Sequence, residues 1–532
     1  YVGDASVYLF GKNGEAPNDS ILYKNLNIHY YDKLRVRPNM LYRWMNYQQF
    51  VRSKQMRASN RTRLYSQYRQ EQVQEKLSQL GIFSYLDMQY APRDTTAACD
   101  TLDVTMQATF AKPLDAELEL NVVTKSNDQT GPGASFGVTR NNVFGGGESW
   151  NVKLKGSYEW QTGGGEKSSL MNSWEMGLST SLTFPRVVFP HLGKREFDFP
   201  ATTTFRLYIN QLNRAKYYKL LSFGGNATYD FQPSRTSRHS ITPFKLTFNV
   251  LQHQSEDFKE IAEANPALYV SLRNQFIPAM EYTYTYDNAS VRRIKNPIWW
   301  QSTVTSAGNI TSLIYRAFGK PFNEEDKSLL GAPFAQFVKL NTELRHLWNI
   351  DKNNAIASRM AVGALFTYGN ATIAPYSEQF YVGGANSIRA FTVRSVGPGG
   401  YHPEEGKYSY LDQTGTFRFE ANVEYRFRIF KSFWGATFLD AGNVWLLRKD
   451  RKLLADGTEA RPNSQLRLKT FPKQIALGTG VGIRYDMDIL VFRLDFGIPL
   501  HLPYDTDRSG YYNVTGAFLK NLGIHFAIGY PF

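Results

Sequence analysis

The feature of this sequence that most limits its fold is the strict alternation in residues 417–429, FRFEANVEYRFRI. Its odd-numbered positions are apolar or aromatic, and its even-numbered positions, from Arg418 to Arg428, carry a charge or an amide. Because successive side chains of a β-strand point to opposite faces, this pattern predicts a strand with one apolar and one charged face. Such a strand suits a wall between hydrocarbon and water.

Segments of about ten residues with this period, typical of barrel strands, recur from residue 113 onward, and about sixteen can be counted. Examples are 116–122 (AELELNV), 280–286 (MEYTYTY) and the last segment, 521–531. A soluble sandwich also alternates, but its polar face rarely carries so many charges opposite aromatic-rich rows. We therefore predict a transmembrane β-barrel of about 16 antiparallel strands over residues 113–532, with a long sixth extracellular loop at 369–415.

The composition agrees with strands as the membrane-crossing elements. Aromatic residues make up 15% of the chain, yet the mean hydropathy is -0.41. The sequence has no run of about 18 apolar residues, so it offers no candidate transmembrane helix. A barrel exposes only half of each strand to lipid, and its mean hydropathy therefore resembles that of a soluble protein.

Residues 21–112 predict a small α+β domain. A strand fits LYKNLNIHYY (22–31), a short helix is expected after Pro38, and the clearest helical segment is 62–80. Its residues Val73, Leu77 and Leu80 share one helix face, and Gly81 provides a C-terminal cap. Two further strands are predicted at 82–90 and 101–110. Residues 1–20 are expected to be the tail end of a preceding domain or a linker.

The charge and the reactive residues exclude several functions. The formal net charge is +14, which favours anionic partners, but the densest basic stretch, 52–69, belongs to no recognisable nucleic-acid module. The single cysteine, Cys99, and the eight scattered histidines form no disulfide or metal pattern. GASFG (133–137) matches the G-x-S-x-G pattern of hydrolases, but no helix follows it. We predict no enzymatic activity, no cofactor, no metal and no nucleic-acid partner.

A long glycine-rich loop, YVGGANSIRAFTVRSVGPGG (381–400), lies between the eleventh and twelfth predicted strands. The alternation of FLDAGNVW (438–445) places Phe438, Asp440 and Gly442 on the lumen side of the next strand, and Glu424 lies on the charged face of residues 417–429. If the loop folds into the lumen, Arg389 meets Asp440. We expect this charge-assisted pair to fix the loop inside the barrel.

These residues carry a resemblance to a known family. The segment GGANSIRAFTVRSVGPGG resembles the sixth-loop motif of the outer-membrane assembly superfamily that contains BamA and TamA, and FLDAGNVW, residues 477–500 and the terminal GIHFAIGYPF resemble its strands. The module before residue 110 is similar to a POTRA domain. The resemblance covers essentially the whole chain and leans towards TamA and TamL proteins. It assigns the loop motif to the following residues: Gly383, Gly384, Ile388, Arg389, Ala390 and Phe391.

Two features depart from the family pattern. Ala390 stands where the motif has glycine, and alanine disfavours positive φ. A single POTRA-like module is visible where BamA and TamA have several, so we expect more of them upstream.

The resemblance implies insertion or assembly of outer-membrane proteins without ATP, in the bacterial outer membrane with the POTRA domain in the periplasm. The implied partners are unfolded outer-membrane protein clients, outer-membrane lipid and lipopolysaccharide, and periplasmic TamB-like or lipoprotein partners. A lateral gate between the first and last strands would open for a client strand. Its expected residues are Leu118, Leu120, Val122, Gly523, Phe526, Gly529 and Phe532. A two-partner secretion transporter and a passive outer-membrane channel stay open as alternatives.

Overall fold

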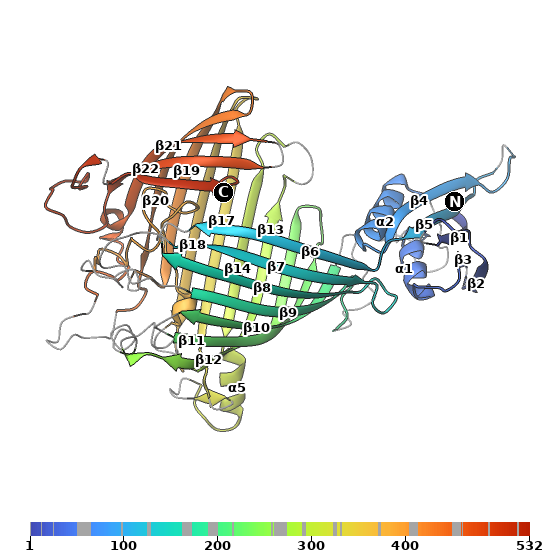
Figure 1. Ribbon diagram of the computed structural model, residues 1–532, viewed down its shortest axis with the longest axis horizontal. Coiled ribbons are helices and arrows are strands. Elements are labelled where there is room, and N and C mark those ends of the chain that lie inside the picture. The colour runs from blue at the N-terminus through green and yellow to red at the C-terminus, as the bar shows by residue number, and fades with distance from the viewer. Residues whose placement is uncertain are drawn as a thin grey trace, which may run out of the picture. The chain divides into compact units, whose positions relative to one another are not determined.

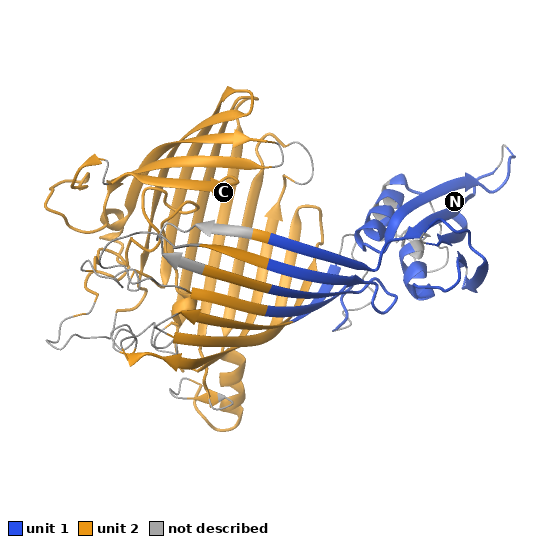
Figure 2. Cartoon of the chain, viewed as in Figure 1, with its two compact units in different colours: residues 1–119, 135–154, 178–206 blue, residues 120–134, 155–177, 207–532 orange. Residues whose placement is uncertain are grey.

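The computed structural model describes the chain apart from residues 1, 12, 25, 50–64, 97–98, 125–128, 162–172, 190–200, 215–217, 257–258, 260–273, 290–293, 323–326, 330–331, 371–373, 404–412, 450–458, 460, 488–489 and 519–520. Two compact units make up the chain (Figure 2). The first holds residues 1–119, 135–154 and 178–206, and the second holds residues 120–134, 155–177 and 207–532.

The N-terminal domain combines a mixed sheet with two helices, as the sequence predicts, but the sheet has five strands where three were expected, since β1 was not predicted for this domain and the expected strand at 22–31 falls on both β2 and β3. Its elements are β1 (Val2–Phe10), β2 (Asp19–Tyr23), β3 (Leu26–Tyr30), α1 (Pro38–Gln49), α2 (Gln67–Gln79), β4 (Phe83–Pro92) and β5 (Leu102–Phe110). The sheet order is β2-β3-β1-β5-β4, with β1 parallel to both of its neighbours. The central strand β1 thus lies within the segment 1–20 that we expected to be a tail or linker; the domain bounds themselves stay a prediction.

Helix α2 follows the predicted periodicity. Val73 and Leu77 are fully buried in the domain core together with Val7 and Met106. Gly81, at φ 65°, takes the left-handed conformation that ends a helix without strain on a side chain. Residues 62–64 of the expected helix and residues 52–64 of the basic stretch lie outside the described residues.

The second sheet is the predicted barrel sheet of sixteen antiparallel strands (Figure 1). Its strands follow one another in chain order. They are β6 (Leu114–Thr124), β7 (Gln129–Asn141), β8 (Ser149–Gln161), β9 (Ser173–Phe184), β10 (Ala201–Arg214), β11 (Tyr218–Phe231), β12 (Ser237–Gln254), β13 (Gln275–Asp287), β14 (Ile298–Ala307), β17 (Phe337–Asn349), β18 (Asn354–Thr367), β19 (Phe417–Phe430), β20 (Phe433–Trp445), β21 (Ala476–Asp486), β22 (Val491–His501) and β23 (Gly523–Ile528).

Burial along β19 is inverted relative to a soluble protein. Glu420 and Glu424 are 1% and 0% exposed, whereas Val423 and Tyr425 are 48% and 39% exposed. The charged face therefore points into the protein and the apolar face points out of it. This is the arrangement that lipid around a barrel requires.

The strands β6 and β23 form the two edges of the sheet, and the described residues show no pairing between them. The last strand is shorter than the expected 521–531. It ends at Ile528 because Gly529, with φ 86°, leaves the extended conformation. Within β7, residues 133–137 are extended rather than forming the strand-to-helix elbow of a hydrolase, and the Ser135 hydroxyl donates to Glu119 Oε2 at 3.1 Å.

Short elements occupy the connections. They are α5 (Asn309–Ala317), β15 (Ser328–Leu329) and β16 (Ala332–Pro333) between β14 and β17, η1 (Tyr376–Glu378) after β18, and η2 (Phe471–Gln474) before β21. No helix was predicted at α5. None of the helices in the described part of the chain is long and apolar enough to cross a membrane.

Candidate functional site

The loop that joins β18 to β19, here called the Arg389 loop, spans residues 368–416, of which 371–373 and 404–412 are not described. Its turn is closed by hydrogen bonds from the Gly383 amide to Ser387 Oγ at 3.0 Å and from the Gly384 amide to the Phe391 carbonyl at 2.8 Å. Gly383 has φ 105°, and a Cβ there would collide with the Thr392 carbonyl. Glycine is therefore required at this position.

The Arg389 side chain is completely buried and binds two carboxylates. Its Nε and Nη2 donate to the two oxygens of Asp440 at 2.8 and 2.9 Å, and its backbone amide donates to Asp440 Oδ2 at 3.0 Å. Its Nη1 donates to Glu424, and its guanidinium lies 3.6 Å from the centre of the Phe438 ring. The structure thus brings together Arg389, Asp440, Glu424 and Phe438, which the sequence had placed near the lumen.

Four further charged residues extend this pair into a cluster that joins neighbouring strands. On β21, Arg484 donates to Glu424 at 3.1 Å and pairs with Asp495 of β22 at 2.6 Å. Arg493 of β22 pairs with the same Asp495 at 3.3 Å and donates to Asn386 of the loop. On β19, Arg426 donates to Glu424 at 2.8 Å. Buried charges are stable only when paired in this way, so the cluster fixes the loop against β19–β22.

Glycines on the last strands give the loop backbone room to approach. A Cβ on Gly497 would lie 2.6 Å from the Arg389 carbonyl oxygen, and a Cβ on Gly478 would collide with Ala390. Ala390 itself does not take positive φ, so alanine fits the loop conformation at this departure from the family motif. Gly442 likewise leaves room for the loop, since a Cβ on Gly442 would lie 3.3 Å from Ile388 Cγ2.

The loop also contacts the last strand. His525, a buried residue of β23, donates from Nε2 to the Arg389 carbonyl at 2.8 Å. Near it, a Cβ on Gly523 would lie 3.2 Å from the same oxygen. Four members of this site were not predicted from the sequence: Arg484, Arg493, Asp495 and His525. Alternation on the last strands, with Arg493, Asp495 and His501 on one face of β22, is the signal that places such residues inward.

Five of the seven residues expected at a gate lie on the two edge strands, whereas Gly529 and Phe532 follow the end of β23. On β6, Leu118 and Leu120 are 67% and 74% exposed, and the side chain of Val122 is outside the described part. On β23, Phe526 is 68% exposed. Beyond Gly529 the chain turns so that the Phe532 carbonyl accepts a hydrogen bond from Arg426 Nη2 at 3.4 Å.

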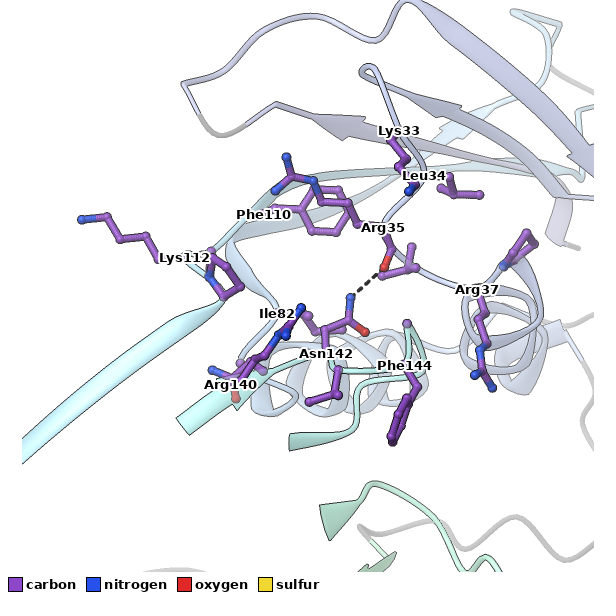
Figure 3. Close-up of a pocket in the computed structure, with 18 residues that line it drawn as sticks. Lys33, Leu34, Arg35, Arg37, Ile82, Phe110, Lys112, Arg140, Asn142 and Phe144 are labelled. Atoms are coloured by element: carbon purple, nitrogen blue, oxygen red, sulfur yellow. Dashed lines mark hydrogen bonds between the residues drawn. The ribbon is translucent and has the colours of Figure 1, made fainter. Parts of the chain in front are cut away.

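The N-terminal unit holds a cavity of about 670 Å³ (Figure 3), lined by residues 33–38, 81–82, 110–113 and 140–145. The amide of Asn142 donates to the Arg35 carbonyl at 2.8 Å across it. Its lining is basic, with Lys33, Arg35, Arg37, Lys112 and Arg140. Figure 3 shows Arg35, Arg37 and Lys112 directed away from one another, so these three side chains do not converge on one ligand.

Within the described ranges, no group of three or more histidine, cysteine, aspartate or glutamate side chains could hold a metal ion. The buried cluster contains carboxylates and guanidiniums that are already bound to one another. What this arrangement can do is positional: it holds a long loop inside the sheet and ties that loop to the last strand.

The comparisons with known proteins agree with this geometry. The model of the Omp85 superfamily domain matches residues 142–532, which is more than half of the chain. The structure of BamA from Haemophilus ducreyi lacking POTRA domains 1-3 has a TM-score of 0.57 at 12% identity, covering 96% of this chain and 88% of that one. CdiB from Acinetobacter baumannii also matches, with a TM-score of 0.47 at 12% identity, covering 88% of this chain and 69% of that one. CdiB from Escherichia coli matches with a TM-score of 0.44 at 11% identity, covering 99% of this chain and 89% of that one.

The likeness to BamA shows a shared fold, and the family match confirms the resemblance seen in the sequence. Members of this superfamily are non-enzymatic assembly or transport proteins that handle outer-membrane substrates, and their barrels lie in the bacterial outer membrane. The chain belongs to the Omp85 superfamily.

Proposed function

We propose that this chain is an outer-membrane protein assembly factor of the TamA and BamA type. Unfolded outer-membrane proteins would enter through a lateral gate between β6 and β23, and residues 21–112 would form a POTRA domain in the periplasm. The observation that carries the proposal is that the sheet ends in two strands, β6 and β23, which are not paired with each other in the part of the chain that the structure describes. Unpaired backbone groups are costly in a membrane, and a strand edge that displays them is a template for another strand.

The last strand supports this proposal. It has six residues, against eleven in its partner β22, and its outward residues Ile524, Phe526 and Ile528 are all more than half exposed. A short ladder is easier to separate or extend than a long one, since each residue adds backbone hydrogen bonds. The apolar outward row suits an edge that stays in lipid while a client strand is added.

The partners would meet the N-terminal domain at a sheet edge. In the order β2-β3-β1-β5-β4, the strand β4 forms one edge and β5 is interior. We propose β4 as the strand that receives clients, or a TamB-like or lipoprotein partner, by β-augmentation.

The experiment is a reversible lock of the gate. In a Cys99→Ser background, a panel of cysteine pairs joins Leu118 or Leu120 of β6 to Ile524 or Ile528 of β23. The matched control is the pair Leu439→Cys and Thr479→Cys, which face each other across β20 and β21. The assay measures insertion of a heat-modifiable client barrel into vesicles before and after reduction.

We expect oxidation to stop insertion in the gate pairs and reduction to restore it, while the control pair inserts clients in both states. Full insertion by a locked gate would contradict the lateral route. A protein that inserts no client in any state, but exports one dedicated substrate or only conducts ions, would instead be a two-partner secretion transporter or a passive channel.

A further inference from the structure

Helix α5 has its apolar side facing away from the protein. Ile310, Leu313, Ile314 and Ala317 follow the i, i+3, i+4, i+7 spacing that normally marks the core-facing side of a helix. Here Ile310, Leu313 and Ile314 are 46%, 55% and 52% exposed. The polar residues Thr311 and Ser312, on the opposite side, are the buried ones. The helix is therefore amphipathic in the inverted sense.

Buried polar contacts fix this orientation. The Ser312 hydroxyl donates to Gln336 Oε1 at 2.9 Å, and Lys327 Nζ, itself 2% exposed, donates to Ser312 Oγ at 3.1 Å. The Tyr368 hydroxyl donates to Asn309 Oδ1 at 2.8 Å. Gly308, at φ 69°, makes the corner between β14 and the helix. Rotating the apolar side inward would leave these buried groups without partners, which is unfavourable.

The strand that leads into α5 turns apolar side chains outward. On β14, Trp300 and Val304 are 41% and 40% exposed, while Thr305 and Ala307 are buried, so the even-numbered side chains of this strand face outward. In Figure 1, α5 extends past the lower margin of the strands. At the end of the helix, Phe318 is 85% exposed, and the exposed Arg316 and Lys320 flank it.

We propose that α5 lies in the membrane interface, at the barrel end where β14 ends, with its apolar side in the acyl boundary of that lipid leaflet and Arg316 and Lys320 against lipid phosphates. An inverted amphipathic helix with basic residues at its border is the form taken by interfacial helices. Lipid is the occupant because α5 directly follows a strand whose outward side chains are apolar, and because cations border the apolar side of the helix. The proposal rests on the barrel spanning a membrane and not on the lateral gate.

The test places an environment-sensitive fluorophore on single cysteines of the full chain in a Cys99→Ser background. Leu313→Cys and Phe318→Cys report on α5, Val304→Cys reports on the lipid-facing wall, and Lys352→Cys reports on the exposed turn between β17 and β18. Each protein is reconstituted in vesicles of phosphatidylethanolamine and phosphatidylglycerol, with or without lipids that carry a quencher near the headgroup.

We expect the α5 labels to lose about half of their emission to the shallow lipid quencher, as for an interfacial helix, with little loss at Lys352. Replacing Leu313 and Ile314 by glutamate should abolish quenching of the Phe318 label, with the polar side of the helix unchanged. Labels that behave like the Lys352 label would place α5 in water. Labels that emit as in an apolar environment and yet escape the lipid quencher would mean that protein covers the helix. Either result overturns the proposal.

Discussion

Replacing Arg389 by alanine tests whether the buried cluster holds the barrel together. Arg389 is the only charged partner of Asp440 in the described residues, whereas Glu424 keeps Arg426 and Arg484. The substitution therefore leaves Asp440 buried with the Asn422 amide, at 2.9 Å, as its remaining side-chain partner. Removing one member of a buried ion pair costs about 3–5 kcal/mol, which we take as the expected loss of unfolding free energy.

The matched control is Arg394→Ala in the same loop. Arg394 is half-buried, donates to the Tyr376 hydroxyl at 2.8 Å and lies 4.5 Å from the centre of the Tyr381 ring. It faces aromatic rings rather than carboxylates, so its removal should cost about 1 kcal/mol or less. Urea unfolding in lipid vesicles, followed by tryptophan fluorescence, measures both variants, and an unchanged slope against urea shows that the same transition is compared.

A double variant separates the pair from the fold around it. Because the cost of Arg389→Ala comes from the stranded carboxylate, adding Asp440→Asn should recover about 1–3 kcal/mol as coupling energy. Exchanging the two charges should not rescue the barrel, because a glutamate at position 389 would face two other carboxylates. One is Glu424, which pairs with Arg389, and the other is Asp495, whose Oδ2 lies 3.9 Å from Arg389 Nη1. A loss for Arg389→Ala no larger than that for Arg394→Ala, or strict additivity with Asp440→Asn, would refute the reasoning.

The remaining predictions concern the contacts between the loop and the last strands. Gly478→Ala places a Cβ against Ala390 and should lower unfolding free energy by about 1–3 kcal/mol, with most of the loss restored by Ala390→Gly; Gly156→Ala, where the added Cβ meets nothing, is the control. Equal effects at Gly478 and Gly156 would argue against the close approach. His525→Phe removes the hydrogen bond to the Arg389 carbonyl and should speed amide hydrogen exchange of β23 by up to about tenfold, whereas Ile524→Val on the outward side should not; unchanged exchange would show that the histidine does not hold the strand.

Much of the barrel could be predicted because a two-residue period states directly which side chains share a face. The inward positions of Glu424 and Asp440 follow from the period alone. The same period agrees with the burial of Glu420 and the exposure of Val423 on β19. The same rule, applied to β22, would have placed Arg493 and Asp495 beside them. The contact between Gly497 and the Arg389 carbonyl could not be found this way, since it depends on how a long loop folds across three strands.

The helix α5 shows the limit of periodicity in a membrane protein. Its apolar spacing at Leu313 and Ile314 would predict a core-facing side in a soluble protein, and nothing in the local sequence states which side meets the protein. Residues outside the helix decide which side faces the protein: Gln336 and Lys327 bind the buried Ser312, and the apolar side therefore faces outward. The local sequence therefore shows that the helix has an apolar and a polar side, while tertiary polar contacts determine which of the two is buried.

The position of the buried cluster bears on how an edge strand can serve as a template. Arg389 reaches β19 and β20 through its side chain and β23 through its carbonyl, so the loop braces the strand at the edge of the sheet from inside. A template must hold its backbone groups in register while a new strand pairs with them, and a six-residue strand with one neighbour is poorly held by its own ladder. If β23 is the template proposed above, the loop supplies this rigidity on the side that a client strand would not occupy. The loop motif and the short terminal strand would then act together: the loop holds β23 from inside through His525, and the other edge of β23, which is unpaired in the described residues, is left for the client.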